Sequence, residues 1–343
     1  MNSNRLLELD ALRGLAAIAV VVYHYFYRYN EIYGHENLPT DWSYLGKYGV
    51  HLFFMVSGFV IFWTLNRTDR PLDFLVSRFS RLYPAYWAAV IITFLAVFSL
   101  GLPGREVSLG SAIVNILMFQ EYLRVPHVDG VYWTLTIELT FYFWIFLLYI
   151  SSNLDKVVGV FSVLVVASVA HSLEFISIPY PLYKVFILKY IPLFLAGICF
   201  YKLTSEGRSL ATVFALGLSL SSIIAIYSLY EFFLFSFFYL LFYLAVSGNL
   251  KVLSLKPLVF LGSISYSLYL LHQNVGYIII NKTYELQLNP ILGVLGSIVI
   301  SIGMATLLVR FIEKPALNKI RSAYKRSERM QNFSDRLSFR SDR

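Results

Sequence analysis

Long apolar segments recur along this chain, and they limit more than any other feature what it can fold into. Each is about 17 to 23 residues long, which is the length an α-helix needs to cross about 30 Å of hydrocarbon. The chain is 58% hydrophobic and 14% charged, whereas soluble domains are about 45–50% apolar and about 25% charged. The sequence therefore predicts an all-α, polytopic bundle of membrane helices and excludes a soluble globular domain.

We expect about ten transmembrane helices. The predicted spans are residues 11–29, 46–65, 83–100, 134–150, 157–173, 185–201, 209–228, 232–247, 257–280 and 291–312. The apolar segment 109–122 is too short to cross and is predicted to be interfacial or re-entrant. Because Glu8 and Asp10 precede the first span and no small-residue cleavage site follows it, we expect a permanent helix rather than a signal peptide.

Lysine and arginine are concentrated in alternate loops. The basic residues of one set of loops are Arg67, Arg70, Arg78, Arg81, Lys156, Lys202, Arg208, Lys251 and Lys256. The opposite loops are poorer in basic residues for their length, so the positive-inside rule places both termini in the cytoplasm. We divide the chain into a membrane domain, residues 1–312, and a basic cytoplasmic tail, residues 313–343. Beside a membrane bundle, such a tail favours anionic lipids as partners and not nucleic acid.

Ionisable side chains inside the predicted spans are the first candidates for function, because they are expensive to bury in a membrane. Asp10, Arg13 and His24 fall near one face of the first helix. His24 lies about 20 Å along the helix from Ala11, in the outer half. The alternative for His24 is an ordinary hydrogen-bonded histidine in the core.

Four ionisable groups from four helices are predicted to meet at one depth in the outer half: His24, His51, Glu138 and His272. The alternative is that each of them pairs or snorkels independently. A histidine beside a carboxylate suits general-base chemistry, because the carboxylate orients the imidazole and stabilises the imidazolium. We therefore predict that His24, assisted by Glu138, activates a hydroxyl for attack on a thioester, directly or through an acyl intermediate.

Two arginines mark the inner side. Arg78 and Arg81 lie three residues apart, on one face of a helix that enters the membrane. Guanidinium groups bind phosphate oxygens in pairs, so these two suit a phosphorylated cofactor arriving from the cytosol. The alternative is ordinary anchoring on the cytoplasmic side. There is no GxSxG elbow, and the single cysteine, Cys199, has no obvious base beside it, so neither a serine or cysteine nucleophile nor a cysteine metal site is expected.

Five segments occur in one order along the chain: LDALRGLAAIAVVVYH, GVHLFFMVSGFVI, FLVSRFSRLYPAYW, WTLTIELTFYF and GSISYSLYLLH. Together they resemble the bacterial membrane acyltransferase family three, which includes the O-acetylases of O-antigen, capsule and Nod factor. The resemblance extends from residue 6 to residue 315. It implies transfer of an acyl group, usually acetyl from acetyl-CoA, to a sugar hydroxyl. No hydrolase-like domain follows the last span, so we expect the activity to reside in the bundle.

The residues and the resemblance together give three sets of site residues. The expected catalytic residues are Asp10, Arg13, His24 and Glu138. The expected residues for acyl-CoA are Ser57, Arg78, Arg81 and Tyr83. The expected residues for a glycan or lipid-linked sugar acceptor are Tyr132, Trp133, Tyr142, Tyr266, Tyr269 and His272. The family often has an acidic residue where this chain has His51, so the role of His51 is open.

These assignments predict a multi-pass O-acyltransferase of the bacterial inner membrane with no permanently bound cofactor and no metal. Two other classes of protein remain as alternatives. A transporter of lipid-linked sugars or acyl groups would also bury charges among many helices. A membrane scaffold without chemistry would leave the converging ionisable groups unexplained. The aromatic residues at the outer end of residues 134–150 also suit an interfacial belt.

Overall fold

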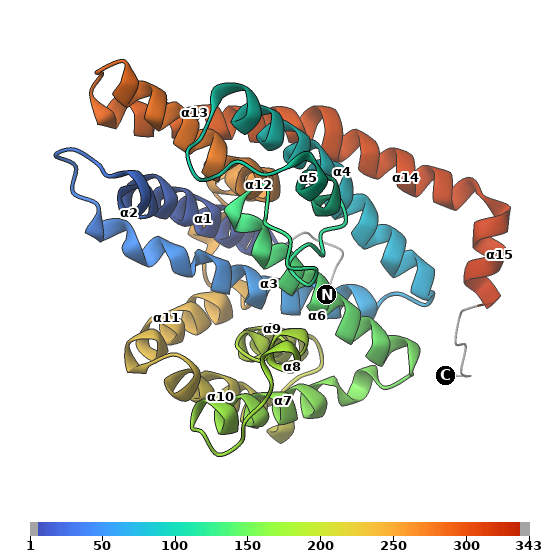
Figure 1. The fold of residues 1–343 in the computed structure, drawn as a ribbon. Helices are drawn as coiled ribbons and strands as arrows, with labels where there is room; N and C mark the ends of the chain where they lie inside the picture. Colours follow the sequence, from blue (N-terminus) through green and yellow to red (C-terminus); the bar gives the residue numbers. More distant parts are fainter. Residues whose placement is uncertain (1–5, 337–343) are drawn as a thin grey trace.

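The computed structural model describes residues 6–336, and Figure 1 shows them as a bundle of helices. The α-helices are α1 (Leu7–Tyr23), α2 (Tyr29–Tyr33), α3 (Gly49–Leu65), α4 (Pro71–Leu100), α5 (Leu109–Asn115), α6 (Trp133–Ile150), α7 (Val157–Ser172), α8 (Tyr180–Val185), α9 (Ile191–Ser205), α10 (Leu210–Ile226), α11 (Leu229–Val246), α12 (Lys256–Glu285), α13 (Pro290–Leu308), α14 (Lys314–Arg326) and α15 (Glu328–Arg336). No strand occurs in this part of the chain. The prediction of an all-α polytopic bundle is confirmed.

Each of the ten predicted spans contains a helix, but they differ in length and hydropathy. Seven helical stretches between residues 6 and 336 are long and apolar enough to cross a membrane: Leu7–Tyr33, Asp41–Leu65, Pro71–Leu100, Gly130–Ile150, Leu154–Ser172, Leu229–Val246 and Pro290–Arg326. The helices α9 and α10 are apolar but shorter. The helix α12 has 30 residues, but buried polar side chains such as His272, Gln273 and Asn274 lower its hydropathy. The segment 109–122 contains only the short helix α5, as expected for a piece that does not span.

Two helix pairs pack so closely that only glycine fits between them. A Cβ atom on Gly262 of α12 would lie 2.0 Å from the backbone oxygen of Asp10 on α1. A Cβ atom on Gly197 of α9 would lie 2.0 Å from the backbone oxygen of Met55 on α3. Small residues let helix backbones approach in membrane bundles, where packing replaces the hydrophobic effect as the driving force. These contacts fix α1 against α12 and α3 against α9.

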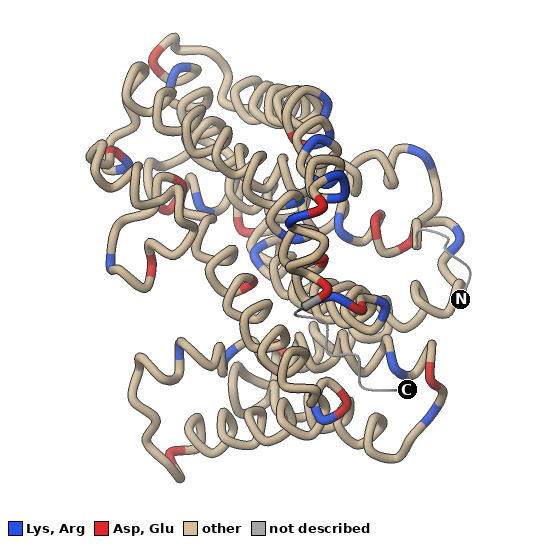
Figure 2. Tube along the Cα trace, turned by 90° about the vertical axis from the view of Figure 1, so that its right-hand side faces the viewer, with Lys and Arg blue, Asp and Glu red and all other residues tan. Residues whose placement is uncertain are grey.

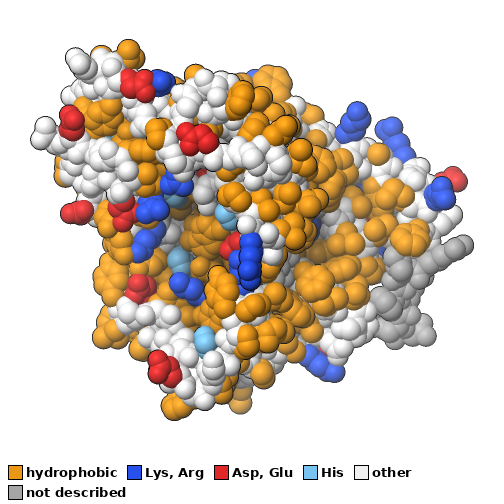
Figure 3. Space-filling view, viewed as in Figure 1, with side chains coloured by type: hydrophobic (Ala, Val, Ile, Leu, Met, Phe, Trp, Pro, Cys, Tyr) orange, Lys and Arg blue, Asp and Glu red, His pale blue; other side chains and the backbone are white. Residues whose placement is uncertain are grey.

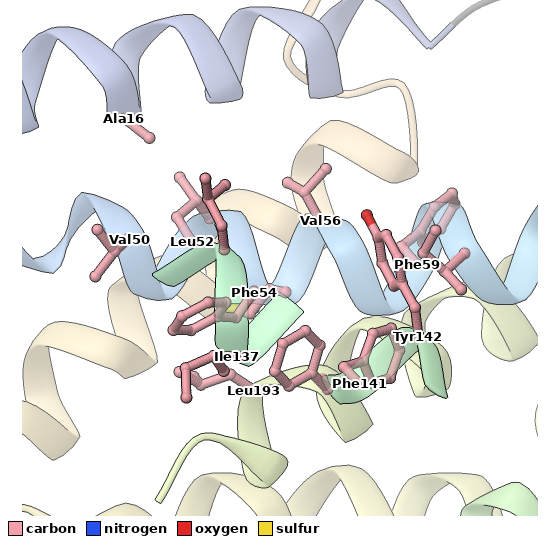
Figure 4. Packing of buried hydrophobic residues seen from close by; sticks show 14 of the residues in the cluster. Ala16, Val50, Leu52, Phe54, Val56, Phe59, Ile137, Phe141, Tyr142 and Leu193 are labelled. Carbon is pink, nitrogen blue, oxygen red and sulfur yellow. The ribbon is translucent and has the colours of Figure 1, made fainter. Parts of the chain in front are cut away.

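The interior between α3, α6 and α9 is filled by aromatic and branched side chains (Figure 4). The rings of Phe141 on α6 and Phe194 on α9 stack with centroids 4.1 Å apart. The central helix α12 also packs along α13 and α4. The polar groups described below therefore sit in a densely packed frame.

Two short π-helical segments interrupt the first and last long helices. The first, His24–Arg28, lies between α1 and α2, and the second, Val309–Glu313, joins α13 to α14. The helix α14 thus continues from α13 and packs against α4. Figure 2, which faces the end of the bundle near α14 and α15, shows Lys and Arg positions in blue along this part of the backbone. The domain boundary at residue 312 and the cytoplasmic position of both termini stay predictions.

Candidate active site

A cavity of about 430 Å³ lies between α1, α3, α4, α6, α12 and the start of α14, and we name it the inner cavity. Its charged lining consists of five cationic and three carboxylate side chains: Arg13, Arg78, Arg81, Lys314, Arg321, Asp10, Glu138 and Glu313. The inner cavity therefore holds an excess of positive charge in a partly dehydrated space. Such a space binds anions well, because electrostatic attraction is stronger there than in water.

The two arginines predicted from their spacing both line the inner cavity, but their surroundings differ. Arg81 Nη1 donates to Glu313 Oε1 at 2.5 Å, and the Glu313 side chain is only 2% exposed. The second oxygen, Glu313 Oε2, accepts a hydrogen bond from Ser267 Oγ at 2.8 Å. Arg78 donates through Nη2 to Ser77 Oγ at 3.1 Å, and its buried Nε has no hydrogen-bond partner among residues 6–336. Arg78 thus has a buried donor group that no described residue engages, whereas Arg81 is paired with a carboxylate.

The helix α14 contributes residues that sequence reasoning assigned only to a basic tail. Arg321 donates through Nε to Ser80 Oγ at 3.1 Å and through Nη2 to Ser77 Oγ at 3.2 Å. Lys314, seven residues earlier and therefore on nearly the same helical face, lines the inner cavity as well. The seven-residue spacing of Lys314 and Arg321, about two helical turns, is visible in the sequence. It would have predicted that both basic side chains lie on the helical face that packs against the bundle.

The expected pair of His24 and Glu138 is not formed. Glu138 lies in the inner cavity, where Oε1 accepts a hydrogen bond from Ser57 Oγ at 2.7 Å and another from the hydroxyl of Tyr142. Asp10 and Arg13, expected on the same face of the first helix as His24, line the same inner cavity. Ser57 therefore lies in the same cavity as Arg78 and Arg81, whereas Glu138 does not reach the histidine it was expected to assist.

The depth assigned to Glu138 is wrong because α6 begins inside the bundle rather than at its outer surface. Asp129 and Tyr132, just before α6, are fully buried. Asp129 Oδ2 accepts a hydrogen bond from the backbone N–H of Asn274 at 3.0 Å, only two residues from His272. Glu138 follows Trp133, the first residue of α6, by five residues, which places it about 7.5 Å farther along the helix at 1.5 Å per residue.

A second cavity, of about 520 Å³, lies toward the other end of the bundle, and we name it the outer cavity. His24, His51 and Trp133 line it, as does Gln273 of α12. The lining residues that sequence reasoning did not assign include Arg28, Lys47, Arg105, Lys189, Tyr190, Tyr227 and Glu231. Val50 and Tyr269 belong to the linings of both cavities, so the two spaces adjoin.

The hydrogen bonds of His24 define its tautomer. Its Nδ1 lies 2.9 Å from the backbone oxygen of Val20 and 3.1 Å from Nε2 of His272. The Nδ1 of His272 lies 2.9 Å from the backbone oxygen of Tyr269. A carbonyl oxygen only accepts, so we assign the ring hydrogen of both histidines to Nδ1. The Nε2 of His24 then carries a lone pair in a side chain that lines the outer cavity.

His272 lies behind His24 and does not line either cavity. It is fully buried, and its backbone oxygen accepts a hydrogen bond from the hydroxyl of Tyr25 at 2.6 Å. Its assignment to acceptor binding is therefore wrong in position: His272 contacts His24, which in turn faces the outer cavity. The partner of His24 is this second imidazole instead of the expected carboxylate.

The predicted aromatic residues are divided between the two cavities. Trp133 lines the outer cavity and Tyr269 lines both. Tyr142 and Tyr266 line the inner cavity only. Tyr132 is fully buried and donates to the backbone oxygen of Leu270 at 3.2 Å, so it supports α12 and lines neither cavity.

Tyr83, assigned to the donor, points away from the inner cavity. It follows Arg81 by two residues, which is a rotation of about 200° around an α-helix. Its hydroxyl donates to the backbone oxygen of Leu117 at 3.3 Å, and its ring stacks on Phe79. His51, whose role was open, is buried among aromatic rings, and its Nδ1 has no hydrogen-bond partner in the described part of the chain.

No group of three or more His, Cys, Asp and Glu that could hold a metal ion occurs among residues 6–336. The expectation that the protein uses no metal stays a prediction.

Comparison with known proteins identifies the family. A family described as "Acyltransferase domain" matches residues 6–310. The acyltransferase MdmB of Streptomyces mycarofaciens is 30% identical over 148 residues, which are 40% of this chain and 38% of that protein. The peptidoglycan O-acetyltransferase OatA of Listeria monocytogenes is 32% identical over 91 residues, 25% of this chain and 12% of that protein.

The exopolysaccharide production protein ExoZ of Rhizobium meliloti is 26% identical over 106 residues, 29% of this chain and 32% of that protein. The matched segments thus cover less than half of each of these three relatives. No solved structure matches the chain. None of these matches supports the alternative of a transporter, and the resemblance expected from the five sequence segments is confirmed. The inner and outer cavities are therefore those of a chain that belongs to the membrane acyltransferase family.

Proposed function

We propose that this protein is a membrane O-acyltransferase that transfers an acyl group, with acetyl favoured, from acyl-CoA to a hydroxyl of a cell-surface polysaccharide or lipid-linked glycan. The observation that carries the proposal is the pair of adjoining cavities, one rich in cations and the other lined by His24. The donor's phosphates would bind in the inner cavity, and the acceptor hydroxyl would lie beside His24 in the outer cavity.

The lining of the inner cavity supports binding of a phosphorylated donor. Five cationic side chains face three carboxylates, and one of those carboxylates, Glu313, is already neutralised by Arg81. The unpartnered Nε of Arg78 is a donor that the protein itself does not satisfy. Leaving such a group buried costs about 1–3 kcal/mol, which a phosphate oxygen would recover.

The distance between the cavities fits a donor with a long arm. Arg13 lines the inner cavity and His24 the outer one, and they are eleven residues apart on the first helix. At 1.5 Å per residue this separation is about 16 Å. In a CoA thioester the reactive carbonyl is separated from the phosphates by a long flexible chain, which would pass Val50 and Tyr269 where the cavities adjoin.

His24 is the group that would act as the base. Its Nε2 would take the proton of the acceptor hydroxyl while the hydroxyl oxygen attacks the thioester carbonyl carbon. The new C–O bond forms and the C–S bond breaks, and the CoA sulfur leaves as a thiolate that takes the proton from the imidazolium. Both proton transfers of this reaction, from the hydroxyl and to the thiolate, use Nε2 of His24.

His272 would take the supporting role first assigned to Glu138. Its Nε2 lone pair lies 3.1 Å from Nδ1 of His24. When Nε2 of His24 gains a proton, this contact stabilises the resulting imidazolium and keeps the ring oriented. Glu138, bound to Ser57 and Tyr142 in the inner cavity, would instead shape the donor site.

Two of the relatives support a glycan as acceptor by their names, peptidoglycan O-acetyltransferase and exopolysaccharide production protein. Aromatic rings of Trp133, Tyr190 and Tyr227 line the outer cavity and provide flat apolar surfaces for a sugar ring. We place the protein in the bacterial inner membrane with both termini in the cytoplasm, so that the donor enters from the cytosol.

The test is an acyl-transfer assay with purified protein in nanodiscs, labelled acetyl-CoA and a lipid-linked glycan. His24→Ala should lower turnover by about 10²–10⁴-fold. His171→Ala is the matched control, because His171 lies at the end of α7 outside both cavities. Near-normal turnover in correctly inserted His24→Ala would refute the mechanism. Mass spectrometry of surface glycans with and without the gene identifies the acceptor.

A further inference from the structure

Four basic side chains line the outer cavity: Arg28, Lys47, Arg105 and Lys189. The outer cavity has one carboxylate in its lining, Glu231, and that carboxylate is already engaged. Tyr48 donates its hydroxyl to Glu231 at 2.5 Å, and Ser228 donates to it as well. Figure 3 shows blue basic side chains around a hollow on the left of this face, with pale-blue histidine visible inside it.

Three of these cations lack a carboxylate partner. Among the described residues, no salt bridge involves Lys47, Arg105 or Lys189. Arg28 pairs with Glu31 at 2.8 Å, but both side chains are about 40% exposed, and such exposed pairs contribute little to stability. The outer cavity thus carries positive charge that the protein itself leaves largely uncompensated.

Two other basic residues, which do not line the outer cavity, are paired with carboxylates. Lys184 lies 2.8 Å from Glu121, and Lys282 lies 2.7 Å from Glu285. The positive-inside bias also makes basic residues unfavourable in outer loops. A gathering of cations around one outer cavity therefore runs against the general distribution of charge and requires a local reason.

Aromatic rings hold two of the lysines at the cavity. Lys189 Nζ lies 5.4 Å from the ring centroid of Tyr227, and Lys47 Nζ lies 4.9 Å from that of Tyr48. A cation over an aromatic face is stabilised without being neutralised. Lys47 also donates to the hydroxyl of Tyr44, but an ammonium group has three N–H donors, so both lysines keep donors with which to bind an anion.

From this cavity we infer that the acceptor is anionic: it carries a phosphate or carboxylate close to the hydroxyl that is acylated. The inference rests on the proposed function and adds the substrate class. Lys47, Arg105 and Lys189 bind the anionic group, and the hydroxyl then lies near Nε2 of His24. The transfer step itself is unchanged, because the anion is bound and takes no part in bond formation.

Steady-state kinetics test this inference with three acceptors of the same sugar sequence: a lipid-diphosphate glycan, a uronate-containing glycan without phosphate, and a neutral glycan. Lys47→Gln/Lys189→Gln should raise KM for an anionic acceptor by about tenfold or more, because each lysine loses a charged hydrogen bond. It should change KM for acetyl-CoA less than twofold and lower kcat/KM for the neutral glycan by a smaller factor than for the anionic acceptors. Lys282→Gln, whose lysine pairs with Glu285 outside the cavity, is the control.

The two anionic acceptors distinguish a lipid-carrier phosphate from a sugar carboxylate as the group that is bound. A neutral glycan used as efficiently as both anionic ones would overturn the inference. A rise in KM for acetyl-CoA without a rise for the acceptor would also overturn it, because the lysines would then bind the donor.

Direct binding separates this inference from the proposed function. If the wild-type protein acylates none of the acceptors, the proposed function fails, while calorimetry with inorganic pyrophosphate and oligogalacturonate still tests the outer cavity. We expect binding of one of these anions to the wild type and to Lys282→Gln, and at least tenfold weaker binding to Lys47→Gln/Lys189→Gln. Equal affinity in all three proteins, or no binding to any, would refute an anion site.

Discussion

The two arginines of the inner cavity, Arg78 and Arg81, should contribute unequally to donor binding. Arg78 has a buried Nε without a partner, so its replacement removes a donor that only a ligand uses. Hydrogen bonds to charged groups contribute about 1.5–3 kcal/mol. We therefore expect Arg78→Ala to weaken acetyl-CoA binding by roughly 10- to 150-fold. Arg78→Lys should rescue poorly, because an ammonium cannot replace the guanidinium fork.

Arg81 is held by a carboxylate, so its replacement has a second effect. Arg81→Ala leaves Glu313, with its side chain 2% exposed, as an uncompensated charge. Removing one partner of a buried ion pair lowers the free energy of unfolding by about 3–5 kcal/mol. Because the Arg81 side chain is 31% exposed, we expect a loss of about 3 kcal/mol or less here. Glu313→Gln should instead release Arg81 for the donor and tighten acetyl-CoA binding up to about fivefold.

Calorimetry of acetyl-CoA binding in nanodiscs measures these affinities, and thermal inactivation measures stability. Arg81→Gln/Glu313→Gln should recover the stability lost in Arg81→Gln, while Arg78→Ala should keep nearly normal stability. Lys156→Ala is a control for general electrostatics, because Lys156 is an exposed residue outside both cavities. The reasoning is refuted if Arg78→Ala binds acetyl-CoA within twofold of the wild type, or if Glu313→Gln weakens binding.

Three further predictions concern the base and the topology. His272→Ala should lower acyl transfer less than His24→Ala, and the double variant should be no worse than His24→Ala, since groups acting as one unit are not additive. Glu138→Gln should mainly raise KM for acetyl-CoA. Because Glu138 and His24 lie in different cavities, the factors by which Glu138→Gln and His24→Ala lower kcat/KM should multiply in the double variant. A double variant no worse than His24→Ala alone would instead support the pairing of His24 with Glu138. Reporter fusions after Arg208 should read cytoplasmic and those after Asp41 periplasmic, and the reverse pattern would place the outer cavity on the cytosolic side.

The helices could be predicted from the sequence because hydropathy reports directly on burial in a membrane. All ten predicted spans contain helices, and the resemblance to an acyltransferase family is confirmed. The helix α12 does not meet the composition of a simple span, because its polar side chains face the interior of the bundle. Hydropathy does not distinguish a polar residue that faces water from one that is hydrogen-bonded inside.

The positions of site residues could be predicted only where one helix determines them. The spacing of Arg78 and Arg81 placed both side chains in one cavity, since i and i+3 share a helical face. The pairing of His24 with Glu138 required the relative depth of two helices, and the buried start of α6 changed that depth. Glu313 could not be found from its surroundings in the sequence, because its partner Arg81 is 232 residues away. The chemical roles of all these residues stay predictions.

The π-helical segment that begins at His24 affects which side chains of the first helix reach the outer cavity. A π segment arises from one extra residue in an α-helix, so the chain beyond it is rotated relative to the chain before it. Asp10 and Arg13, near the start of the helix, line the inner cavity, whereas Val20 and Tyr23 before the segment and Arg28 within it line the outer one. A substitution at Arg28 should therefore change the lining of the outer cavity without moving Asp10 and Arg13 in the inner one.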